Sequence, residues 1–162
     1  MYGAFKMNIP PYNIDITTYR VEFSYNKRHP TITYTDDINC DIKRRDFTIN
    51  AILMDKNGNK DLLGGLEDIR NKKIRAIGNP NEKFIEDPLR MLRALRFYAT
   101  LNFSIEKETL NALKKNKELL STLSKTRIKS ELDKILLSPN VVKSLDYLKK
   151  LGILKILNIK YK

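Results

Sequence analysis

The chain contains very little cysteine and histidine, and this scarcity excludes several kinds of site. Cys40 is the only cysteine, so no disulfide can form within the chain, and a reducing, cytoplasmic setting is expected. His29 is the only histidine, and no second histidine or cysteine stands beside it. We therefore expect His29 to be a solvated loop residue rather than a zinc ligand.

Long apolar runs are missing too. None approaches the roughly 18 residues that a membrane-spanning helix needs, so no membrane partner is expected. The first residues, MYGAFKMNIPPY, lack the basic, apolar and small-residue regions of a signal peptide. Hydrophobic residues still make up 41% of the 162 residues, which is enough for the core of one large domain or two small ones.

Acidic residues are too few to balance the basic ones. The chain has 31 lysines and arginines against 19 acidic residues, a net charge of +12. Residues 1–100 carry 17 basic and 13 acidic groups, whereas residues 101–162 carry 14 and 6, a net charge of +8. This excess predicts a polyanionic partner, with nucleic acid first. A lysine-rich composition that only keeps the protein in solution is the alternative.

Two regions of the chain differ in pattern. Residues 1–78 are rich in strand-forming segments, such as 12–23, and Asn57-Gly58 is a strong hairpin signal. From about residue 79 helical periodicity takes over, and four helices are expected from Pro88 onward. The later helices have candidate capping residues at Ser104, Ser124 and Asn140. The sequence thus predicts an α+β protein with domains at residues 1–78 and 79–162.

The segment KFIEDPLRMLRALRF, residues 83–97, combines a helix start with closely spaced charges. Asp87 and Pro88 suit the first positions of a helix, and on a helical wheel Asp87 and Arg90 lie about 60° apart. A helix cap with a surface ion pair is the simple interpretation. Alternatively, a carboxylate acceptor beside a guanidinium donor matches the pairing edges of cytosine and adenine and rejects those of uracil and guanine.

Several motifs together resemble a known family. RRDFTINAI (44–52), DLLGGLEDIRNKKIRAIGNP (61–80), EDPLRMLRALRF (86–97) and RIKSELDKILLSP (127–139) resemble the bacterial-type tRNA nucleotidyltransferases, that is, the CCA-adding enzymes, and the similar bacterial poly(A) polymerases. The resemblance implies a partial nucleotidyltransferase head of the polymerase-β type with a mixed sheet. A helical, nucleotide-selecting neck bundle would follow it.

The resemblance also implies roles for individual residues. In the family, the EDxxR acid and arginine act as an amino-acid template for the base of CTP or ATP, and these are Asp87 and Arg90 here. The arginines of the RRD motif lie near base and phosphates, and Asp46 lies near the ribose hydroxyls. Arg93 would reach a phosphate or brace Asp87. The implied nucleotide-binding residues are Arg44, Arg45, Asp46, Asn50, Asp87, Arg90 and Arg93.

The family's GG-x-x-RD start and its DxD pair are not found in this sequence. Asp36 and Asp37 are contiguous, and Asp15 stands alone, as a possible accessory carboxylate. The Mg²⁺ ions of the complete enzyme therefore have no ligands here, and the catalytic residues are not assigned. We expect the chain alone to be inactive. A split or mis-started gene, a decaying remnant and a fragment retained for binding are three explanations.

A head that lacks strands would leave a sheet edge exposed, which predicts a complementary N-terminal polypeptide or a homo-oligomer as partner. The complete enzyme is expected to add CMP and AMP from CTP and ATP to the 3′ end of tRNA. A poly(A) polymerase or an enzyme that adds a single kind of nucleotide is one alternative. The other is a non-catalytic RNA-binding remnant, whose affinity would fall steeply with salt.

Overall fold

The computed structural model describes residues 3–26 and 29–159. The chain divides into two compact units, Met1–Arg45 and Asp46–Lys162, and each is described by itself. The boundary expected at residue 78 falls inside the second unit, so the division into domains 1–78 and 79–162 stays a prediction. Among the described residues, none of the helices is long and apolar enough to cross a membrane.

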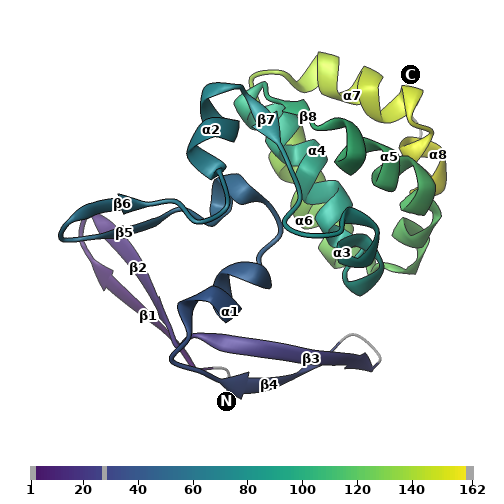
Figure 1. The fold of residues 1–162 in the computed structure, drawn as a ribbon. Helices are drawn as coiled ribbons and strands as arrows, with labels where there is room; N and C mark the ends of the chain where they lie inside the picture. The colour runs from purple at the N-terminus through teal and green to yellow at the C-terminus, as the bar shows by residue number, and fades with distance from the viewer. Residues whose placement is uncertain (1–2, 27–28, 160–162) are drawn as a thin grey trace. The chain divides into compact units, whose positions relative to one another are not determined.

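The first unit consists of two antiparallel hairpins and a short helix (Figure 1). β1 (Ala4–Ile9) pairs with β2 (Tyr12–Thr17), and β3 (Arg20–Asn26) pairs with β4 (His29–Tyr34). Helix α1 (Ile38–Lys43) follows. The strand composition at residues 12–23 is thus confirmed.

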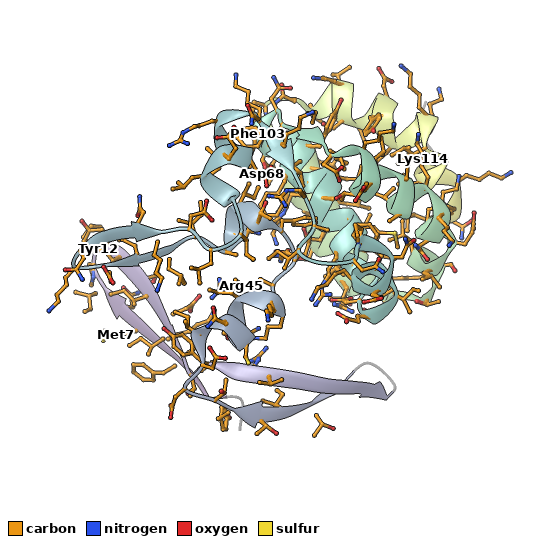
Figure 2. The ribbon with its side chains drawn as sticks, in the orientation of Figure 1. Met7, Tyr12, Arg45, Asp68, Phe103 and Lys114 are labelled. Atoms are coloured by element: carbon orange, nitrogen blue, oxygen red, sulfur yellow. The ribbon has the colours of Figure 1, made fainter. Side chains whose placement is uncertain are left out.

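The β1–β2 hairpin has one apolar and one polar face. Residues directly opposite each other in an antiparallel pair lie on the same face. The apolar face is made by three such pairs, Phe5 with Ile16, Met7 with Ile14, and Ile9 with Tyr12. Figure 2 labels two of these residues, Met7 and Tyr12. This face lies open to solvent, with Phe5 60% and Tyr12 66% exposed.

The strands of the second unit are short. The hairpin predicted at Asn57-Gly58 is confirmed, with β5 (Leu53–Asp55) antiparallel to β6 (Gly58–Lys60). β7 (Lys73–Ile74) runs parallel to β8 (Ser104–Ile105). The expected α+β class is therefore confirmed. However, the described strands pair two by two and do not form one mixed sheet, because three of the four pairs are local hairpins.

Helices make up most of the second unit (Figure 1). They are α2 (Gly65–Arg70), α3 (Pro80–Glu86), α4 (Leu89–Leu101), α5 (Lys107–Asn116), α6 (Lys125–Leu136), α7 (Val141–Lys150) and α8 (Ile153–Ile156), with the 3-10 turns η1 (Thr48–Asn50) and η2 (Lys117–Thr122). The Ser124 cap is confirmed. The Ser104 cap is wrong, because Ser104 lies in β8 and Glu106 caps α5. Asn140 begins α7 without a side-chain cap bond and donates its amide to Ala99 O instead.

Helix α4 is the centre of this unit, and α6 and α7 pack against it. The helical pattern predicts a buried face made of Leu89, Leu92, Leu95 and Ala99. The last three are fully buried, whereas Leu89 is only partly buried against the same core. They join a core cluster with residues from the neighbouring elements, including Phe47, Ile74, Phe84, Leu113, Ile135, Leu148 and Ile153. The arginines of α4 are therefore held on a rigid helix, which positions the candidate site.

Candidate nucleotide site

Asp87 lies at the junction between α3 and α4, outside both helices. Its backbone is extended (φ −144°, ψ 100°), and its Oδ1 accepts a hydrogen bond from Leu89 N at 3.1 Å. Asp87 thus satisfies a free N–H at the start of α4, as expected for a capping residue. The guanidinium that binds Asp87 belongs to Arg127 on α6, whose Nη2 lies 3.1 Å from Oδ1 and 2.9 Å from Oδ2.

The Asp87 carboxylate keeps acceptor capacity for a further ligand. An ionised carboxylate has about four lone-pair sites. Leu89 N and Arg127 Nη2 occupy Oδ1, and Arg127 Nη2 alone occupies Oδ2. The side chain is 29% exposed, so a ligand can reach the carboxylate, which has one acceptor position left by this count.

Arg90 has different partners from Asp87. Its Nη1 donates to Lys83 O at 3.1 Å and to Glu86 Oε2 at 2.7 Å, and its side chain is only 9% exposed. These bonds fix the plane of the guanidinium. Helical spacing suggests an ion pair between Asp87 and Arg90; the ion pairs that the structure shows at this junction are Asp87–Arg127 and Glu86–Arg90. The wheel argument assumed a helical Asp87, whereas α4 begins only at Leu89.

Asp46, Asn50 and Arg93 form a cluster within the second unit. Asp46 is buried, and its Oδ1 accepts from Phe47 N at 2.9 Å and from Asn50 Nδ2 at 3.0 Å. Its Oδ2 lies 2.5 Å from Arg93 Nε. Arg93 therefore braces Asp46, 47 residues away in sequence, and not Asp87. The cluster attaches the end of the RRD motif to α4.

Arg44 and Arg45 lie in the first unit and share one buried partner. Asp41 accepts from Arg44 Nε at 2.9 Å and from Arg45 Nη2 at 3.1 Å. Burial of Asp41 raises its pKa, but the hydrogen bonds and charges of the two arginines outweigh burial and leave the pKa below its ordinary value. Sequence reasoning missed Asp41, although its i,i+3 and i,i+4 spacing to the arginines on a short helix would indicate this contact.

Helix α6 carries two further charged residues that the sequence did not single out. Arg127 and Glu131 are four residues apart, and both reach the region of α4. Glu131 Oε2 lies 3.1 Å from Arg96 Nε, within ion-pair distance but without hydrogen-bond geometry. Arg96 also lies over the ring of Phe97, 4.4 Å from its centre. The motif RIKSELDKILLSP thus contributes the partners of two charged groups at the site.

The DLLGG segment builds the start of α2. Asp61 accepts from Leu63 N, Gly65 N and Leu66 N at 3.2, 2.9 and 2.8 Å. Burial raises the pKa of Asp61, but these backbone hydrogen bonds prevail and lower it. Gly65 lies directly against η1, where a Cβ would come within 2.3 Å of Thr48 O. The segment therefore joins α2 tightly to the turn that follows the RRD motif.

Asp15 does not form a metal site with the described residues. It lies on β2 opposite Lys6, with 3.9 Å between the charged groups, and its side chain is 70% exposed. Within residues 3–26 and 29–159, no group of three or more histidine, cysteine or acidic side chains is placed to hold a metal ion. Its role as an accessory carboxylate stays a prediction.

Comparison with known proteins identifies the class. A family model described as the poly A polymerase head domain matches residues 3–75. A second one, described as the probable RNA and SrmB-binding site of polymerase A, matches residues 102–159. The two matches follow each other along the chain in the order of the two regions that the sequence indicates. The chain belongs to the family of tRNA nucleotidyltransferases and bacterial poly(A) polymerases.

The relatives are CCA-adding enzymes. One from Streptococcus gordonii is 44% identical over 146 residues, which cover 88% of this chain and 37% of that protein. A Bacillus stearothermophilus CCA-adding enzyme in complex with CTP matches with a TM-score of 0.84 and 34% identity, covering 94% of this chain and 37% of that one. This chain therefore spans little more than a third of the length of these relatives.

Two further solved structures show other ligands. A CCA-adding enzyme in complex with ATP has a TM-score of 0.82 and 30% identity, covering 99% of this chain and 37% of its own. A Thermotoga maritima CCA-adding enzyme complexed with tRNA has a TM-score of 0.70 and 33% identity, covering 77% of this chain and 32% of that one. Both are similar to this chain over most of the described residues.

Proposed function

We propose that this chain is the nucleotide-selecting part of a template-independent tRNA nucleotidyltransferase, which adds CMP and AMP from CTP and ATP to the 3′ end of tRNA in a cytoplasmic setting. The observation that carries the proposal is the α3–α4 junction. There a partly exposed carboxylate with one remaining acceptor position stands three residues before an anchored guanidinium. The solved relatives hold CTP, ATP and tRNA, which supports the same ligands here.

Asp87 would accept a hydrogen bond from the exocyclic amino group of cytosine or adenine, and Arg90 would donate one to the unprotonated ring nitrogen beside it. Uracil and guanine present a carbonyl oxygen beside a ring N–H. The carboxylate of Asp87 would then face another acceptor, and the guanidinium of Arg90 would face another donor. Buried hydrogen-bonding groups without partners are costly, which gives strong discrimination. We also propose nucleotide-binding roles for five further residues, which are Arg44, Arg45, Asp46, Asn50 and Arg93.

The donor set of the described residues does not fit the Mg²⁺ ions that the family implies. We therefore propose that the metal ligands come from another part of the complete enzyme, and we assign no catalytic step to this chain. The open apolar face of the β1–β2 hairpin supports a partner there, because six apolar side chains on one exposed face call for a cover. A complementary N-terminal polypeptide or a second copy would provide it.

Binding of the four nucleoside triphosphates, measured by calorimetry, tests the proposal. CTP and ATP are expected to bind at least tenfold more tightly than UTP and GTP, in line with the cost of unpaired polar groups. Equal binding of all four would overturn it. Primer extension by the completed enzyme then separates CCA addition from poly(A) synthesis or addition of only one kind of nucleotide, through the sequence of the product.

A non-catalytic RNA-binding module is a second candidate. Two observations favour it, the net charge of +8 over residues 101–162 and the match of residues 102–159 to an RNA-binding family model. RNA binding by the chain together with undetectable binding of CTP and ATP would support this candidate over nucleotide selection.

A further inference from the structure

A surface cavity lies between the end of α4 and one face of α7, and none of the nucleotide-site residues lines it. Its volume is about 550 Å³, and its lining is formed by Tyr98, Val142, Lys143, Asp146, Tyr147 and Lys150. The last four follow each other at spacings of three, one and three residues, so they share one face of α7. Small-molecule sites have volumes of about 300–1,000 Å³, and this cavity lies within that range.

Two tyrosines form an aromatic wall of this cavity. The rings of Tyr98 and Tyr147 are stacked, with centres 4.7 Å apart and planes inclined by 27°. Burial raises the pKa of both hydroxyls; Lys150 opposes this for Tyr98, whereas Tyr98 adds to it for Tyr147. Both phenols therefore stay neutral at physiological pH. A neutral, half-buried ring pair offers a rigid surface on which a base can stack.

Two exposed lysines line the same cavity as the tyrosine pair. Lys143 Nζ lies 5.3 Å from the ring centre of Tyr98 and donates to Asn102 Oδ1 at 2.8 Å. Lys150, seven residues further along α7, is also exposed. Asp146 between them is an acceptor that suits a base amino group or a ribose hydroxyl. Aromatic rings with lysines nearby are the combination by which proteins bind unpaired nucleotides of RNA.

We propose that this cavity, named the α7 cavity, docks one unpaired nucleotide of an RNA strand, with its base on the tyrosine pair and adjacent phosphates on Lys143 and Lys150. The inference rests on the proposed function, because that function gives the chain an RNA substrate. It adds a second contact, distinct from the site at Asp87 and Arg90 that selects the incoming triphosphate. RNA is favoured over a protein partner because the surrounding residues 101–162 carry a net charge of +8.

The charge contribution is tested with the full chain and two labelled RNA hairpins, one with a single-stranded 3′ end and one blunt. Lys143→Gln and Lys150→Gln are each expected to weaken binding of both hairpins several-fold and to reduce the slope of log K against log salt by about one. Lys114→Gln is the matched control, since Lys114 is exposed on α5 and lies outside the cavity lining (Figure 2). It should change the slope less.

The stacking contribution has its own readout, the preference for the hairpin with the single-stranded end. Tyr147→Phe should keep this preference, because the ring remains. Tyr147→Leu should lower it by roughly fivefold or more, in line with typical losses when a base loses its aromatic partner. Val142→Glu adds a negative charge at a residue that is 67% exposed, so it should weaken RNA binding without disturbing the fold. This variant decides the matter if Tyr147→Leu does not fold.

Binding of CTP is measured on the same variants to separate this inference from the proposed function. Weaker RNA binding with unchanged CTP binding supports the α7 cavity. If the cavity variants bind RNA as tightly as Lys114→Gln does and still bind CTP, the proposal of the α7 cavity is overturned and the proposed function is not. A wild-type chain that shows no preference for the single-stranded end also overturns it, even if a protein partner binds at this face. If the wild-type chain binds CTP no more tightly than UTP, that result contradicts the proposed function instead.

Discussion

Arg127 and Asp87 are 40 residues apart in sequence, yet Nη2 of Arg127 lies 3.1 and 2.9 Å from the two carboxylate oxygens of Asp87. This contact joins α6 to the junction between α3 and α4. It limits the directions in which the carboxylate can turn and leaves one of its acceptor positions open. We therefore expect Arg127 to act as a positioning residue for Asp87.

Replacement of Arg127 by alanine should lower the selectivity for CTP over UTP several-fold, because the Asp87 carboxylate becomes free to rotate. Arg127→Lys should restore part of the selectivity, since lysine supplies the charge without the planar guanidinium. The pair is partly exposed, so stability should change by only about 0.2–1 kcal/mol. Calorimetry with both nucleotides and urea unfolding measure the two effects. Unchanged selectivity in the alanine variant would show that Asp87 needs no brace.

The pair between Arg96 and Glu131 is more deeply buried, with side chains 17% and 4% exposed. Removal of one partner leaves a charge in the core, so Arg96→Met should lower the free energy of unfolding by about 3 kcal/mol or more. Lys134, 3.2 Å from Glu131, offsets part of this loss. The double variant with Glu131→Leu should regain most of it, because apolar residues can replace a buried pair. If urea unfolding shows that the double variant loses as much stability as the two single variants together, this prediction is contradicted.

Gly65 has no space for a side chain. A Cβ would lie 2.3 Å from the carbonyl oxygen of Thr48 and 2.9 Å from its carbon, both backbone atoms that cannot turn away. Gly65→Ala should therefore destabilise the second unit by about 1–3 kcal/mol, as overpacking does. Gly58→Ala serves as control, since no atom lies within 4 Å there and only its φ of +112° is unfavourable. Equal midpoints of thermal unfolding for Gly65→Ala and wild type would disprove the close contact.

The carboxylate of Asp61 links the stability of the chain to pH. Its pKa in the folded chain lies below the ordinary value of 3.8, because three backbone N–H groups bind the ionised form against the effect of burial. A lowered pKa contributes stability that is complete above 3.8 and is lost as the pH falls through the folded value. Asp61→Asn should thus be less stable than wild type at pH 7. The difference should shrink below about pH 3.8 in urea unfolding.

Local patterns of the sequence predicted much of the fold. The Asn57-Gly58 hairpin, the cap at Ser124 and the buried leucines of α4 depend on neighbours within a few residues, and the structure has all of them. The Ser104 cap failed because tertiary pairing with β7 draws Ser104 into a strand. Local propensity does not include such a partner, Lys73, which lies 31 residues away.

The sequence named the candidate site residues but did not predict their contacts with one another. Helical spacing placed Asp87 beside Arg90, whereas the extended backbone of Asp87 turns its carboxylate to Arg127. Likewise, Arg93 was expected at a phosphate or at Asp87. Its partner in the structure is Asp46, and a contact with a phosphate stays a prediction. These partners lie 40 and 47 residues away, and charge pairing over such distances depends on how the helices pack. One sequence does not contain that information in its local spacing.

A CTP analogue that lacks the 4-amino group tests the central claim most directly, because the claim assigns that group to Asp87. In the wild-type chain, loss of the amino group should weaken binding by about 1–3 kcal/mol, or five- to 150-fold, since the carboxylate then loses its partner. In the Asp87→Ala variant the same change in the nucleotide should have almost no effect. An equal loss in wild type and variant would contradict the claim that Asp87 selects the base.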